Sequence, residues 1–376
     1  MGLSRAVPSP PKAVATRQRR PRCPKFVKVG SDFSGLDAGT VAMKRLGVNV
    51  SLEFVCDVSK ASQKVLKAAH GPKCIFPDIL ARSPEDAGYV DVYFWTPPCQ
   101  DLSLSGKQAG LKGPRQTGML IKKSIQYIKT QRPRLAIFEN VPAILQSKFA
   151  HIPRGIREAL VALGYKVFSS TLNSRDYGLP QDRRRVFIVA IKADTMKCDF
   201  KWPTVSQPAP SINTILDPWV PSDKAGRLPS RPAGADLCKA AYKQCYQHGR
   251  DPRRTPVLVD VDCSPKYAVY GVDEAKTLTA TRGGSGGPWL STRGRRLTIN
   301  ELMKLQGFRK EDIQMEAAKV TERQLGHMLG NAVSVNTIGC ILQEALWSAG
   351  LNMAEAIFPR TGTLPQGSFA KQRLNV

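Results

Sequence analysis

The feature that most constrains the fold is a short apolar strand that ends at a pair of prolines. Val92-Tyr93-Phe94-Trp95 is followed by Thr96 and then by Pro97-Pro98-Cys99. Because a proline has no N–H to give to a neighbouring strand, the strand must end here. Ligands and chemistry gather at the carboxyl ends of strands in open α/β sheets, so this position predicts Cys99 as a nucleophile. The alternative is a buried, unreactive thiol, the usual state of a free cysteine.

A second strand end carries an acid in the same way. Arg134 to Phe138 is predicted as a strand, and Glu139-Asn140-Val141-Pro142 follows it. Two strands of one parallel sheet would present Cys99 and Glu139 to the same cleft. Burial would raise the pKa of the Glu139 carboxyl and make it a proton donor. A surface strand end is the alternative for Glu139.

The first two predicted strands suggest a nucleotide-like cofactor. The strand at Phe26–Val29 leads into a glycine-containing loop at 30–40 and then a helix, and the strand at 52–56 ends at Asp57. An acid about twenty residues after such a loop is placed to bind ribose hydroxyls. Asp78 is predicted to end a third strand and to face the cofactor. The alternative for Asp57 is a cap for the helix predicted from about Ser59.

Further along, basic residues alternate on an extended segment. Gln181-Asp182-Arg183-Arg184-Arg185 leads into an apolar strand at 186–190, which places Arg183 and Arg185 on one face. These arginines are predicted to contact phosphate or substrate, with solvation at a charged edge as the alternative.

The net charge of +26 predicts a polyanionic partner, most often nucleic acid. Residues 1–24 are predicted as a disordered basic arm, either a phosphate-binding tail, a nuclear address or simply a solvated tail. Because no apolar run reaches the ~18 residues of a membrane span, a soluble intracellular protein is expected. No Cys-x-x-Cys pair occurs and the histidines lie far apart, so no metal site is expected.

Two domains are expected from a chain of 376 residues. Residues 25–199 carry the strand and helix patterns, whereas the stretch from about 200 is rich in Pro, Ser, Gly and Arg and is predicted to be loop-rich. Aromatic residues alternate with arginines there, which suits either base stacking and phosphate contact or a small core; they are Tyr242, Tyr246, Tyr267, Tyr270 and Trp289. The glycine run at 283–287 is predicted as a flexible loop that approaches a ligand, and Thr298 with Glu301 as a capping box.

Seven motifs in fixed order then resemble the DNA (cytosine-5) methyltransferases. They comprise Phe33-Ser-Gly-Leu-Asp-Ala-Gly39, Pro97-Pro-Cys-Gln100, Glu139-Asn-Val141, Gln181-x-Arg183-x-Arg185, Arg296-Leu-Thr298 with Glu301, Leu305-Gln-Gly-Phe308 and Gly330-Asn-Ala-Val333. They cover about Lys25 to Leu346. The resemblance implies a Rossmann-like methyltransferase domain with a mostly parallel sheet and helices on both faces. It also implies a target-recognition domain at 200–285, motifs that return to the catalytic domain at 286–350, and a tail at 351–376.

The resemblance also implies S-adenosyl-methionine as the cofactor. The residues implied around it are Phe33, Ser34, Gly35, Leu36, Asp57, Val58, Asp78, Ile79, Pro98, Asn331 and Val333. The residues implied to contact the substrate or DNA are Gln100, Ser103, Ser105, Asn140, Gln181, Thr277 and Arg282. The partner implied is double-stranded DNA, bound by a monomer, with the protein in a nucleus or in bacterial cytoplasm.

The reaction implied is cytosine methylation on a base flipped out of the duplex. Cys99 would attack ring carbon 6, Glu139 would act at ring N3, and Arg183 and Arg185 would hold the ring and its phosphate. Two positions depart from the family pattern: Asp37-Ala38 replaces a frequent glycine pair, and Val58 replaces a frequent aromatic residue.

Two alternatives to DNA methylation stay open. One is a tRNA cytosine methyltransferase, although the Cys-Phe-Thr element of that branch is absent from the sequence. The other is a catalytically idle DNA-binding relative, although Cys99 and Glu139 are both present. The sequence indicates neither the target site nor whether methylation is of the maintenance or the de novo kind.

Overall fold

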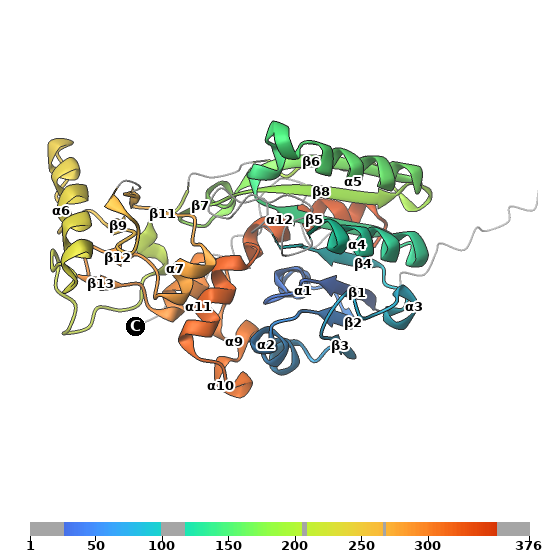
Figure 1. The fold of residues 1–376 in the computed structure, drawn as a ribbon, viewed down its shortest axis with the longest axis horizontal. Helices are drawn as coiled ribbons and strands as arrows, with labels where there is room; N and C mark the ends of the chain where they lie inside the picture. Colours follow the sequence, from blue (N-terminus) through green and yellow to red (C-terminus); the bar gives the residue numbers. More distant parts are fainter. Residues whose placement is uncertain (1–25, 99–116, 205–208, 266–267, 352–376) are drawn as a thin grey trace, which may run out of the picture.

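The computed structural model describes residues 26–98, 117–204, 209–265 and 268–351. The predicted basic arm, the tail from residue 352, Tyr267 and the residues Cys99, Gln100, Ser103 and Ser105 lie outside these ranges. Figure 1 shows a larger α/β part and a smaller part built on a second sheet.

A seven-stranded sheet in the order β3-β2-β1-β4-β5-β8-β6 forms the centre of the larger part. β1 to β5 run parallel, and β8 lies antiparallel between β5 and β6. The strands are β1 (Val27–Asp32), β2 (Val50–Cys56), β3 (Cys74–Phe76), β4 (Val92–Trp95), β5 (Leu135–Asn140), β6 (Tyr165–Asn173) and β8 (Arg184–Lys192). The predicted mostly parallel sheet is therefore confirmed, and Glu139 lies within the end of β5 rather than after it.

Helices cover both faces of this sheet, as predicted (Figure 1). Val92 and Phe94 of β4 belong to a core with α1, α2 and α12, whereas Tyr93 and Trp95 belong to a core with α3, α4 and α5. Because both faces are buried, the strand is apolar at every position and shows no alternation. The covering helices are α1 (Ala38–Arg45), α2 (Lys60–His70), α3 (Pro84–Ala87), α4 (Thr117–Gln131), α5 (His151–Ala162) and α12 (Val335–Ser348).

The smaller part is an antiparallel sheet in the order β10-β9-β12-β13 with one long helix, α6. Val257 and Val259 of β9 pack against α6, whereas Leu258 and Leu290 join the core of the larger part. Helix α6 therefore lies on the face of the small sheet that is turned away from the larger part (Figure 1). The elements are α6 (Pro232–Gln247), β9 (Val257–Val259), β10 (Tyr270–Val272), β12 (Trp289–Leu290) and β13 (Arg295–Arg296).

The prediction of a loop-rich segment from residue 200 missed α6. Its buried residues have helical spacing but are mostly small and weakly apolar; they are Gly234, Leu237, Cys238, Ala241, Tyr242 and Cys245. The surrounding prolines and arginines obscured this pattern. The small sheet also takes strands β12 and β13 from beyond residue 285.

The remaining elements connect the two parts. A short parallel pair, β7 with β11, joins the end of the small part to the segment before β8. These elements are β7 (Gln181–Asp182), β11 (Ala275–Lys276), α7 (Ala280–Gly284), α8 (Ile299–Leu305), α9 (Lys310–Ile313), α10 (Met315–Ala318), α11 (Glu322–Asn331), and the short helices η2 (Pro142–Leu145), η3 (Ser147–Phe149), η4 (Ser174–Tyr177), η5 (Ala193–Thr195) and η6 (Ile212–Ile215). The predicted capping box of Thr298 and Glu301 starts α8 and is confirmed.

The glycine run begins in helix α7 (Ala280–Gly284), so the prediction of a flexible ligand loop is wrong for residues 282–284. A Cβ on Gly283 would lie 2.0 Å from the carbonyl oxygen of Gly326, and a Cβ on Gly326 would lie 2.2 Å from that of Gly283. The two glycines thus let α7 and α11 cross at backbone contact, a packing reason that the local sequence does not show.

In the described ranges, no single helix is long and apolar enough to cross a membrane; α11 and α12 reach that length only as a pair bent by 44°. In the same ranges no three His, Cys, Asp or Glu side chains are grouped as a metal ion would require.

Candidate active site

Four strand ends meet at the carboxyl edge of the large sheet. β1 lies between β2 and β4, and β4 lies beside β5. Because these strands are parallel, the residues after β1, β2 and β4 and the end of β5 share one edge. Phe33, Asp57, Pro98 and Glu139 are therefore brought together from four separate stretches of sequence.

The loop after β1 is tied to the end of β2. The Gly35 N–H donates to Asp57 Oδ2 at 2.8 Å, and the Cys56 N–H donates to Ser34 Oγ at 3.0 Å. Gly35 has a φ of +56°, which favours glycine. Burial raises the pKa of Asp57, and hydrogen bonds from the Ser59 and Gly35 amides oppose this. The residue that caps α2 is Ser59, so the alternative of Asp57 as the helix cap is not what the structure has.

An apolar surface adjoins Asp57. Phe33, Ile79 and Leu120 belong to one small cluster with Cys56, the residue before Asp57. A flat apolar surface beside a carboxylate that accepts hydrogen bonds suits an adenosine group, whose ring is apolar on its faces and whose ribose donates hydroxyls. Val58 is 74% exposed, so it offers little enclosure. The residues present therefore fit the predicted type of cofactor.

The other predicted cofactor residues differ in their exposure. The Leu36 side chain is buried in the main core, while Asp78 is half-buried and accepts a hydrogen bond from the Leu80 N–H. Asn331 is exposed at the end of α11, and Val333 packs against the main core. Helix α11 reaches α2, where Ser62 Oγ donates to Met328 Sδ at 3.3 Å. This contact places α11, the helix that ends at Asn331, beside α2, the helix that follows Asp57.

Two hydrogen bonds connect the proline turn to its neighbours. Thr96 Oγ1 donates to the Phe33 carbonyl at 3.1 Å, and Asn140 Nδ2 donates to the Pro97 carbonyl at 3.0 Å. Asn140 is buried, and its Oδ1 accepts from the Val141 N–H. The Asn140 amide, predicted to contact substrate, thus holds the backbone two residues before Cys99.

Glu139 is buried beside a guanidinium. Its Oε1 lies 3.1 Å from Arg185 Nε, and both side chains are more than four-fifths buried. Burial raises the pKa of the Glu139 carboxyl, and the charges of Arg185 and Arg183 partly offset that effect. A carboxyl with a raised pKa keeps its proton to a higher pH than an ordinary carboxyl and can act as a proton donor.

The Arg183 and Gln181 side chains are buried and bond to other segments of the chain, whereas they were predicted to contact phosphate, substrate or DNA. The Arg183 guanidinium donates to the carbonyls of Leu278 at 2.8 Å, Gly330 at 3.2 Å and Ala332 at 2.7 Å. Gln181 accepts from the Leu278 N–H and donates to the Leu305 carbonyl. These buried bonds join the segment from β7 to the start of β8 with the residues after β11, the end of α8 and the end of α11.

The two predicted contacts at the end of the small part have internal partners as well. Thr277 Oγ1 donates to the Asp182 carbonyl at 2.8 Å, and Arg282 Nε donates to Asp260 Oδ2 at 2.7 Å. Both side chains stay partly exposed.

Comparison with known proteins agrees with this geometry. The family model described as C-5 cytosine-specific DNA methylase matches residues 27–347. The chain belongs to this family. Relatives of this methylase chain include the type II methyltransferase M.MthTI of Methanothermobacter thermautotrophicus, 33% identical over 178 residues that make up 46% of this chain and 52% of the relative. M.NgoFVII of Neisseria gonorrhoeae is 26% identical over 82% of this chain and 83% of its own length. The chain thus spans about half the length of the first of these relatives.

Solved structures support the fold of this methylase chain. The Entamoeba histolytica methyltransferase EhMeth aligns with a TM-score of 0.61 and 18% identity, covering 86% of this chain and 98% of its own. The S. pombe Dnmt2 methyltransferase aligns with a TM-score of 0.59 and 17% identity, covering 87% and 99%. The chain therefore has the fold of S-adenosyl-methionine-dependent methyltransferases.

One buried cluster at the carboxyl edge of the large sheet was not predicted from the sequence. Asp32, at the end of β1, accepts hydrogen bonds from Arg82 and Tyr93, and the Arg82 guanidinium lies 4.8 Å from the Phe54 ring centre. An acid in an apolar strand indicates a buried partner. The sequence could not identify that partner, because Arg82 lies 50 residues away.

Proposed function

We propose that this chain is a DNA (cytosine-5) methyltransferase. The observation that carries the proposal is the linked strand edge: Glu139 is buried beside Arg185, and Asn140 holds Pro97, two residues before Cys99. This chemistry requires a proton donor and a thiol nucleophile, and the proposal assigns these roles to Glu139 and Cys99.

The cofactor would be held by the loop and strand ends around Asp57. Asp57 would accept the ribose hydroxyls, and the surface of Phe33 and Ile79 would support the adenine ring, with Ser34, Gly35 and Asp78 around them. Pro98, Asn331 and Val333 would lie at the margin, and Leu36 would contribute its backbone. Bound there, S-adenosyl-methionine supplies a methyl group on a positively charged sulfur.

The chain's own groups would prepare the cytosine. The Cys99 thiolate adds to ring carbon 6, and Glu139 gives a proton to ring N3, so that carbon 5 gains the electron density of an enamine. Arg185 keeps Glu139 in place and holds the substrate ring. After methyl transfer a water removes the proton on carbon 5, the Cys99–carbon bond breaks to restore the thiolate, and ring N3 returns its proton to Glu139, which restores the neutral aromatic ring.

The substrate proposed is duplex DNA with the target base flipped out. The net charge of +26 supports binding to a polyanion, and both relatives described above are named type II methyltransferases. Gln100, Ser103 and Ser105 after the nucleophile, together with Thr277 and Arg282, are proposed to face the DNA. The target sequence would be read by the small part.

The test is methyl transfer from tritiated S-adenosyl-methionine to duplex DNA and, separately, to a tRNA pool. Label is expected in DNA, and bisulfite sequencing would then map the target. Label in tRNA alone would replace DNA with RNA as the substrate. Absence of label in both pools, with DNA still bound, would contradict catalysis and indicate a binding protein.

A further inference from the structure

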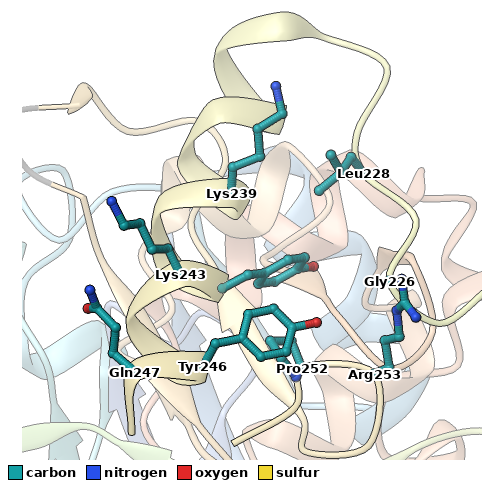
Figure 2. Close-up of a pocket in the computed structure, with 9 residues that line it drawn as sticks. Gly226, Leu228, Lys239, Lys243, Tyr246, Gln247, Pro252 and Arg253 are labelled. Atoms are coloured by element: carbon teal, nitrogen blue, oxygen red, sulfur yellow. The ribbon is translucent and has the colours of Figure 1, made fainter. Parts of the chain in front are cut away.

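The small part has a groove beside α6 that the proposed methylation does not use. Gly226, Leu228, Pro252 and Arg253 face the helix, and the groove has a volume of about 650 Å³. From α6 it is lined by Lys239, Tyr242, Lys243, Tyr246 and Gln247, one stripe of the helix (Figure 2).

The groove is remote from the edge that carries Glu139. Val257 and Val259 pack on α6 on one face of the small sheet, and Leu258 and Leu290 pack on the larger part from the other face. The small sheet therefore lies between the groove and the carboxyl edge of the large sheet. A ligand in this groove would occupy a second site and not the cleft for the target cytosine.

The groove is lined by one exposed aromatic ring, that of Tyr246, and by the exposed side chains of Lys239, Lys243 and Arg253. Tyr246 is 54% exposed, and its hydroxyl donates to Asp251 Oδ1 at 3.3 Å, which limits the rotation of the ring. Lys239 pairs only with Asp236, at 3.0 Å between exposed side chains, a type of pair that contributes little and exchanges readily. In the described part of the chain, the Lys243 and Arg253 side chains form no ion pair with a carboxylate, although the Arg253 backbone N–H donates to Asp251 Oδ1 at 2.9 Å. Figure 2 shows both lysines projecting from the helix that carries Tyr246.

The exposed ring of Tyr246, with lysine and arginine side chains beside it, suits a nucleotide, in which a base is joined to a phosphate group. Stacking on an aromatic ring needs a base whose face is free, and in a duplex the faces are covered by neighbouring bases. Sites of this kind combine stacking rings with a positively charged groove that follows the backbone. Tyr242, by contrast, is buried and belongs to the small core, which is the second of the two alternatives predicted for these tyrosines.

We propose that the groove formed by Tyr246, Lys239, Lys243 and Arg253 binds unpaired nucleotides of single-stranded DNA. The base stacks on Tyr246, and the lysines and Arg253 contact the phosphates. The choice of DNA over RNA rests on the proposed function; the groove itself goes beyond it.

The test measures the affinity of the full chain for a fluorescein-labelled oligothymidylate by anisotropy. Tyr246→Ala is expected to weaken binding on the order of tenfold to hundredfold, and Tyr246→Phe to keep most of it. Replacing Lys239 and Lys243 with glutamine should reduce the slope of log affinity against log salt by about 0.7 for each lysine. Tyr89→Ala is the matched control, because Tyr89 is 41% exposed and also donates to a carboxylate, that of Asp91.

Three outcomes would overturn the proposal. One is unchanged affinity in Tyr246→Ala, and another is an equal loss in Tyr89→Ala. The third is a loss of affinity for duplex DNA in Tyr246→Ala that equals its loss of affinity for oligothymidylate, which would indicate a general contact with the phosphate backbone. Tighter binding of oligouridylate, lost in Tyr246→Ala, would overturn the choice of DNA. Tritium transfer to duplex DNA is measured in parallel and should not change in Tyr246→Ala, so failure of the groove and failure of the methylation proposal give different results.

Discussion

The carboxyl edge of the large sheet and the α6 groove differ in how deeply their charged side chains are buried. At the edge, Glu139 and Arg185 are buried against each other, and Arg183 is bonded to three carbonyls. In the groove, Lys243 and Arg253 are exposed. Burial changes proton affinity and fixes geometry, which chemistry requires, whereas exposed cations are available to phosphates at little desolvation cost. The difference indicates one region suited to reaction and one suited to binding.

Removal of the proposed nucleophile, Cys99, should give the largest difference between the two regions. Cys99→Ser is expected to abolish methyl transfer, because a hydroxyl is a far weaker nucleophile than a thiolate. The assay is formation of a denaturation-resistant complex with duplex DNA that contains 5-fluorocytosine, since no proton can then leave carbon 5. Oligothymidylate binding should stay at the level of the unchanged protein. A complex that survives in Cys99→Ser would show that another residue is the nucleophile.

Glu139→Gln should lower kcat by about 10²- to 10⁴-fold, the usual contribution of a general acid. Burial raises the pKa of Glu139, so its protonated form persists above the ordinary carboxyl range and is lost as pH rises through the raised value. We therefore expect kcat of the unchanged protein to fall on that alkaline side and the fall to be absent in Glu139→Gln. An identical pH profile in both proteins would assign the proton to another group.

Asn140→Ala tests the link between the acid strand and the nucleophile turn. The change leaves the Pro97 carbonyl without its donor and should lower kcat about tenfold to hundredfold through misplacement of the turn. The KM for DNA should change little, because Asn140 is buried. Asn213→Ala, at an exposed position of η6, is the control and should leave kcat unchanged. A change confined to KM would mean that Asn140 contacts the substrate instead.

Gly283→Ala tests whether the two parts are held together by the crossing of α7 and α11. The added Cβ would press on the Gly326 carbonyl, and we expect the free energy of unfolding to fall by about 1–3 kcal/mol, as for other overpacked sites. Gly155→Ala, in α5 with no atom within 4 Å of the new Cβ, should instead stabilise by about 0.5–1 kcal/mol. Urea unfolding followed by circular dichroism measures both. Equal effects in the two variants would contradict the close crossing.

The catalytic part was predictable because its signals are local. Each strand of the large sheet is an apolar run with a defined end, and the acids Asp57 and Glu139 stand at those ends. The small part was less predictable, since α6 has a weak apolar stripe and β12 and β13 are only two residues long. β12 pairs with β9, and β13 pairs with β12. These pairings stabilise the short strands, and two residues are too few to predict a pairing partner from the sequence.

The sequence by itself determined the succession of the strands along the chain, the position of Glu139 at the end of a strand, and the positive charge. Only the tertiary structure decided that Arg183 serves the interior, that α7 and α11 meet through glycines, and that Tyr246 is exposed while Tyr242 is buried. The physical reason is the distance along the chain between partners. Arg183 binds carbonyls 95, 147 and 149 residues away, and no local pattern encodes contacts of that range.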